Sequence, residues 1–159
     1  MLEVKSFLKK DNKFIPVSDF FDLIPDPDYI EGAIEISKWN KKVLTTKNWD
    51  YVDELWSYFV EGIENVSKGK DFETYLPDQP TLVSFKHKSN SKQIVITVGK
   101  NENNSIYVEY NEFLTVMIEK AKEFFHHINR LLPNHQNKYK QTIIDLEVVE
   151  KNLNGKINF

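Results

Sequence analysis

The sequence predicts an α+β fold, in which one antiparallel sheet of about five to seven strands carries two long amphipathic helices and a C-terminal helix, packed mainly on one face. Two long segments repeat apolar residues at spacings of three and four, which is typical of helices with one buried side. Other segments alternate apolar and polar residues and are separated by short turns, as in antiparallel sheets. A chain of 159 residues fits one domain, so we expect a single domain over residues 1–159.

The first helix is predicted over residues 49–68. Asn48 is the expected N-cap, and Lys68 with Gly69 forms the expected end. Asp50 and Asp53 are expected on the polar side, near the positive end of the helix dipole. The predicted buried stripe contains six residues: Trp49, Val52, Trp56, Phe59, Ile63 and Val66.

A second long helix is predicted over residues 112–132, with Asn111 as its N-cap and Pro133 after its end. A third is predicted over residues 138–152, with Gly155 beyond it. Seven strands are predicted, over residues 2–8, 13–17, 29–37, 41–45, 81–88, 92–98 and 106–110, and residues 71–75 are a candidate for a further short strand. Pro16 predicts that the second strand lies at a sheet edge, and residues 19–28 are predicted to form an extended loop.

Composition excludes several classes of protein. There are 21 basic and 24 acidic residues, so the net charge of −3 lacks the basic excess of a nucleic-acid-binding protein. The chain has no cysteine, which excludes disulfides and thiolate metal sites. We see neither a signal peptide nor an apolar run of about 18 residues, so we expect a cytoplasmic protein that has no membrane or nucleic-acid partner.

No catalytic motif is visible. His126 and His127 are adjacent on a helix, so their side chains diverge by about 100° and do not suit one metal ion. Carboxylate pairs such as Asp26 with Asp28, or Asp53 with Glu54, are expected to be exposed charges. We therefore expect no metal, no cofactor and no enzyme activity, with a small hydrolase that uses dispersed carboxylates as the less favoured alternative.

Several stretches together resemble small bacterial immunity proteins of polymorphic, contact-dependent toxin systems, including those that neutralise wall-associated secreted toxins. The resemblance covers about residues 30–125. It is carried by Gly32-Ala33-Ile34-Glu35-Ile36, Leu44, Trp49-Asp50, Leu55-Trp56-Ser57-Tyr58, Leu76-Pro77-Asp78-Gln79-Pro80 and a strand that ends near Phe85. It implies a cytosolic, non-catalytic protein that binds one cognate toxin domain and blocks it.

An acidic tract fits such a role independently. Residues 19–35 contain six acids and no lysine or arginine, interleaved with Phe20, Phe21 and Tyr29. A toxin domain that grips phosphates, such as a nuclease, is basic, and its inhibitor offers carboxylates in return. The alternative is that Phe20, Phe21 and Ile24 only anchor the loop to the core while the acids face water.

The candidate partner-binding residues are Asp19, Asp22, Asp26, Asp28, Tyr29, Glu31, Asp78 and Gln79. Asp78 and Gln79 lie between two prolines, where they either cap adjacent backbone or face a partner. A competing interface uses the free sheet face through Ser84, Lys86, Lys88 and Tyr107. A regulatory or structural protein with another protein partner is the alternative function.

Overall fold

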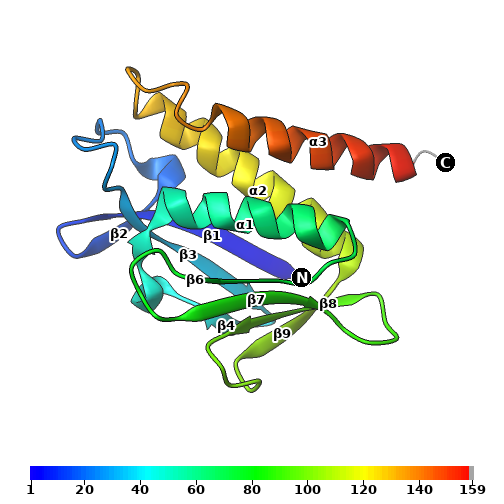
Figure 1. Cartoon of the computed structure of the whole chain (residues 1–159). Coiled ribbons are helices and arrows are strands. Elements are labelled where there is room, and N and C mark those ends of the chain that lie inside the picture. Colours follow the sequence, from blue (N-terminus) through cyan, green and yellow to red (C-terminus); the bar gives the residue numbers. More distant parts are fainter. Residues whose placement is uncertain (158–159) are drawn as a thin grey trace.

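The computed structural model describes residues 1–157, and the side chains of residues 1–155, as an α+β protein. Within residues 1–157, nine strands and three α-helices lie in the order β1–β5, α1, β6–β9, α2, α3 (Figure 1). The α+β class predicted from the sequence is therefore confirmed. The strands form two sheets, however, and not a single one.

The first sheet has five strands, and its backbone is built around β3. The order is β2-β1-β3-β4, and β5 also pairs with β3. Two tight turns, at Asp11-Asn12 and Trp39-Asn40, join neighbouring strands through residues with positive φ. Pro16 is at the outer strand, as predicted. The strands are β1 (Leu2–Lys10), β2 (Lys13–Pro16), β3 (Glu31–Lys38), β4 (Lys41–Leu44) and β5 (Asp50–Tyr51).

The second sheet is an antiparallel meander in the order β6-β7-β8-β9. It packs beside β4 in space but does not extend the hydrogen-bonded ladder of the first sheet. At this junction the Asn104 side-chain amide donates to the carbonyl oxygens of Val43, at 3.1 Å, and of Val98, at 3.0 Å. Strand periodicity shows which faces are buried but not which strands pair, so the division was invisible in the sequence. The strands are β6 (Phe72–Tyr75), β7 (Leu82–His87), β8 (Gln93–Val98) and β9 (Ser105–Glu109).

The helices α1 (Val52–Ser67), α2 (Tyr110–Arg130) and α3 (Lys140–Ile157) lie together on one side of the sheets, with α3 outermost (Figure 1). One hydrophobic cluster joins both sheets to the helices. Its centre is aromatic. The centre of the Phe59 ring lies 6.0 Å from that of Trp56 and 5.2 Å from that of Phe85. The ring centres of Phe85 and Phe113 are 5.1 Å apart.

The start of α1 differs from the prediction. The helix begins at Val52, because Asp50 and Tyr51 pair with β3 and the Val52 amide donates to Ile30 O at 2.9 Å. Trp49 therefore lies outside the helix and is 39% exposed. Asn48 does not cap α1, since its side chain accepts from Thr45 N in a separate short 3₁₀ turn, Thr46–Asn48.

The other helix ends also move. Helix α2 begins at Tyr110 with Glu109 at the N-cap position, so Asn111 lies inside the helix and does not cap it. The strand β9 leads directly into this helix, which leaves no turn in which Asn111 could act. Helix α3 continues past the predicted end and includes Gly155.

Candidate functional site

The structure brings four of the eight predicted partner-binding residues together and separates the rest. Glu31, Asp78 and Gln79 line one cleft of about 480 Å³, and Tyr29 stands beside it, with its ring 5.8 Å from that of Tyr51. Asp19 lies in the 3₁₀ turn Val17–Asp19, and Asp22, Asp26 and Asp28 follow along the loop of residues 20–30. All four of these aspartates are exposed.

The cleft is assembled from three separate segments. The pairing of β3 with β5 places Glu31 opposite Tyr51. The prolyl turn between β6 and β7 brings Asp78 and Gln79 against this pair. Lys47, Trp49 and Asp50 complete the lining. We call the surface formed by Tyr29, Glu31, Trp49, Tyr51, Asp78 and Gln79 the acidic–aromatic face.

Asp50 holds the prolyl turn in place. Its side chain is on the buried side, with the residue only 4% exposed, although the sequence predicted a place on the polar side of a helix. One of its carboxylate oxygens accepts from Tyr51 N at 2.7 Å, and both accept from Asp78 N, at 3.1 and 3.0 Å. A buried carboxylate needs such donors, because an unpaired buried charge is costly.

The Asp78–Gln79 pair combines the two roles that the sequence left open. Asp78 is fixed through its backbone amide, and its own carboxylate is exposed. The Gln79 side-chain amide donates to the Trp49 carbonyl oxygen and so satisfies neighbouring backbone. Gln79 therefore fastens the turn, while Asp78 faces solvent at the mouth of the cleft.

Three acids, Glu31, Asp50 and Asp78, and one base, Lys47, line the cleft. Burial raises the pKa of the Tyr51 hydroxyl, and nearby Asp78, Tyr29, Glu31 and Asp50 raise it further. Burial also raises the pKa of Glu54, and the neighbouring charges of Asp53 and Asp50 add to this effect. Both groups, Tyr51 in the cleft and Glu54 at the start of α1, thus resist the gain of further negative charge because carboxylates lie nearby.

One wall of the cleft already holds a cation of the chain itself. The Lys9 ammonium lies 4.6 Å from the centre of the Trp49 ring and 3.6 Å from a Glu31 carboxylate oxygen. An aromatic face combined with a carboxylate is a favourable setting for lysine or arginine. Sequence reasoning missed Trp49 and Tyr51 here, because it placed Trp49 in the helix core.

The acidic loop carries less net charge than its sequence implies. Lys10 lies 2.6 Å from a carboxylate oxygen of Asp22, and Lys138 lies 4.0 Å from one of Asp28. Both lysines come from distant segments, so no local pattern reveals them. Of the aromatic and apolar anchors proposed for this loop, Phe20 and Ile24 pack against the core, whereas Phe21 is 75% exposed and does not.

Asp53 is the second acid that the sequence misplaced. It is buried at the start of α1, where its carboxylate accepts from the Tyr139 hydroxyl at 2.7 Å and lies 3.7 Å from the Lys138 ammonium. Burial raises the pKa of Tyr139, as do the charge and the hydrogen bond of Asp53. Asp53 therefore serves the interior and does not pair with Glu54 at the surface.

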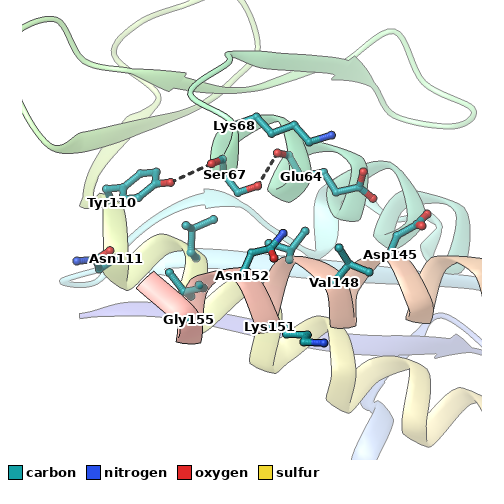
Figure 2. A pocket seen from close by; sticks show the side chains of 13 residues that line it. Glu64, Ser67, Lys68, Tyr110, Asn111, Asp145, Val148, Lys151, Asn152 and Gly155 are labelled. Atoms are coloured by element: carbon teal, nitrogen blue, oxygen red, sulfur yellow. Dashed lines mark hydrogen bonds between the residues drawn. The ribbon is translucent and has the colours of Figure 1, made fainter. Parts of the chain in front are cut away.

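A larger cavity lies elsewhere. A groove of about 1050 Å³ separates the ends of α1 and α3 near the start of α2 (Figure 2). Glu64 and Asp145 face it, and burial, followed by the Asp145 charge, raises the pKa of Glu64. Tyr110 donates to Ser67 O at 3.4 Å at its other end. Among the side chains of residues 1–155, the mixed polar and aliphatic lining of the groove includes none of the predicted partner-binding residues and no convergent set of reactive groups.

The competing sheet face is less open than the sequence predicted. Ser84 is buried, and Lys86 lies 3.8 Å from a carboxylate oxygen of Glu73. The Lys88 ammonium lies 4.9 Å from the centre of the Tyr107 ring, and Tyr107 is half-exposed. This face offers fewer side chains than the acidic–aromatic face, and both of its lysines already contact a neighbouring side chain.

Within residues 1–157, no group of three or more histidine, cysteine, aspartate or glutamate side chains is placed to hold a metal ion. The rings of His126 and His127 lie 5.6 Å apart, and His126 is exposed. Burial lowers the pKa of His127, and Arg130 and His126 lower it further. In the part of the chain that the structure describes, no helix is long and apolar enough to cross a membrane.

Comparison with known proteins adds no relative: no family model, curated protein or solved structure matches this chain.

Proposed function

We propose that this chain is a non-catalytic, cytoplasmic binding protein that uses the acidic–aromatic face to hold a basic protein domain. Within this proposal it is an immunity protein, as the sequence resemblance implies, and its partner is a cognate toxin domain. The observation that carries the proposal is that three distant segments place exposed aromatic rings and carboxylates around one cleft.

The composition of this face supports a protein partner. Interfaces are anchored by aromatic residues and arginine in desolvated pockets, surrounded by polar groups. Tyr29 is 63% exposed although its ring packs edge-on against Tyr51, so the two rings form a preorganised apolar surface. The flanking carboxylates of Glu31 and Asp78 would meet cationic side chains of the partner.

The charge pattern supports a basic partner in particular. The loop of residues 20–30 extends the acidic area beyond the cleft, and Asp26 and Asp78 are exposed. Long-range attraction between opposite charges speeds association and weakens with salt. This favours the toxin reading over a regulatory partner of neutral surface.

The test measures association with the toxin domain encoded beside the gene for this chain. For the wild type, we expect the association rate constant to fall at least about tenfold between 20 and 200 mM NaCl. At 20 mM NaCl, the double variant Asp26→Lys with Asp78→Lys should lower the rate constant at least about tenfold. The matched control, Glu102→Lys with Glu147→Lys, has the same net charge and changes exposed acids outside both this face and the loop of residues 20–30.

A second pair of variants separates contact from charge. Trp49→Ala should weaken binding by about 2 kcal/mol or more, mainly through faster dissociation, if the ring anchors the interface. Trp39→Ala removes an equally large but more exposed ring at the other end of β3 and should leave affinity unchanged. Absence of binding to the toxin domain, or equal effects of the test and control variants, would contradict the proposal.

A further inference from the structure

The connection between α2 and α3 packs against the loop that borders the acidic–aromatic face. At the upstream end of this loop, Ile24 N donates to Leu131 O, at the end of α2, at 3.2 Å. Figure 1 shows the two connections side by side at one end of the molecule, with the loop of residues 20–30 in blue and the connection before α3 in orange. The C-terminal part of the chain therefore supports a surface to which it contributes no cleft-lining residue.

Lys138 is the residue that makes the support specific. Its ammonium donates to the Pro27 carbonyl oxygen and lies near the carboxylates of Asp28 and Asp53, at 4.0 and 3.7 Å. One side chain thus contacts the loop at two consecutive residues and the start of α1 at a third. The next residue in the sequence, Tyr139, fixes the position of Lys138, because the Tyr139 hydroxyl donates to the same Asp53 carboxylate.

The burial of Asp53 explains why this contact is ordered. A carboxylate that is almost removed from water is stable there only with hydrogen-bond donors or a counter-ion. Tyr139 supplies the donor and Lys138 the positive charge. The same ammonium then has directions left for the loop, because lysine carries three donors.

We propose that Lys138 is a positioning residue that holds residues 25–30 of the loop in their binding-competent shape, so that the α2–α3 connection controls the acidic–aromatic face. The consequence for partner binding rests on the proposed function. The effect on the loop does not, since it is a property of the free protein. Tyr29 follows the Lys138 contacts directly in sequence and Glu31 comes two residues later, so a loosened loop would leave the Tyr29 ring without a fixed place.

The deciding experiment is amide hydrogen exchange of the free protein, followed by mass spectrometry of peptides that cover residues 20–30. Lys138→Met keeps the long apolar stem of the side chain but removes the positive charge and the hydrogen-bond donors. We expect exchange in the loop, including the Asp28 and Tyr29 amides that bond to Asp26, to become at least about tenfold faster. Peptides from β7 and β8 should be unchanged, and Lys138→Arg should restore protection.

The control is Lys122→Met. This variant breaks an ion pair of α2 with α3, between Lys122 and Glu150 at 2.9 Å, without touching the loop. Loop exchange within about twofold of the wild type in Lys138→Met, or a rise shared equally by β7 and β8, would overturn the proposal. Failure of the wild-type protein to bind the toxin domain would contradict only the proposed function, because amide hydrogen exchange is measured without a partner.

Discussion

At the scale of single residues, the three tryptophans show how environment decides what a side chain does. Trp56 is fully buried, and its indole N–H donates to Ser6 Oγ at 2.8 Å. Trp49 forms one wall of the cleft. Trp39 is 81% exposed at a tight turn, where its backbone has a φ of 51°. Only Trp56 belongs to the core stripe in which the sequence placed both Trp49 and Trp56.

Trp56→Ala should lower the free energy of unfolding by about 3–5 kcal/mol, because it leaves a cavity and removes the partner of Ser6. The measurement is a urea titration followed by circular dichroism, with the midpoint shift converted through the slope. Trp39→Ala is the control and should change stability by less than about 0.5 kcal/mol, because its side chain is solvated. An unchanged midpoint for Trp56→Ala would remove α1 from its central role.

At the scale of elements, α1 approaches the second sheet at a glycine. A Cβ atom built on Gly62 would lie 2.6 Å from Phe72 Cδ1 and 2.8 Å from Phe85 Cδ2. Both rings are buried and belong to neighbouring strands, β6 and β7. The helix thus contains a residue of low helix propensity, because glycine permits this close approach to the sheet. The sequence alone does not reveal this reason.

Gly62→Ala should therefore destabilise the protein by about 1–2 kcal/mol, since overpacking outweighs the roughly 1 kcal/mol that alanine contributes to a helix. Gly155→Ala provides the matched comparison, because a Cβ there meets nothing within 4 Å. We expect that variant to be neutral or more stable by up to about 1 kcal/mol. Thermal midpoints of both proteins test the pair, and stabilisation by Gly62→Ala would show that α1 does not lie this close to the sheet.

At the scale of the whole molecule, the two sheets share one core although they share no ladder. The buried cluster runs from Val4 and Ile36 in the first sheet to Phe85 and Ile96 in the second. Helices α1 and α2 pack on both sheets, so neither sheet can keep its apolar face covered alone. The prolyl turn that completes the cleft depends on the same arrangement, through Asp50.

We expect unfolding in urea to be one cooperative transition. Tryptophan fluorescence, which reports mainly on Trp56 and its surroundings, should give the same midpoint as far-UV circular dichroism, which reports on all helices and strands. Midpoints that differ reproducibly between the two probes would show that the sheets unfold separately. The two halves would then be distinct domains.

The sequence by itself determined the α+β class, most of the strands, and the acidic and aromatic character of one tract. These features follow from periodicity and composition, which are local. Residues 19–35 alone already suggested a carboxylate-rich surface. The prolyl turn at Asp78 and Gln79 was also recognisable, although its position relative to that surface was not.

Tertiary structure decided the rest, because the missing information is long-range. The pairing of Glu31 with Tyr51, the binding of the Asp78 amide by Asp50 and the contact of Lys138 with Pro27 join residues that lie 20 or more positions apart. Each depends on the free energy of the whole packed chain, and no short window contains both partners. Asp50 and Asp53 were misassigned for this reason. An exposed carboxylate is stabilised by water, whereas a buried one needs hydrogen-bond donors that only the folded chain supplies.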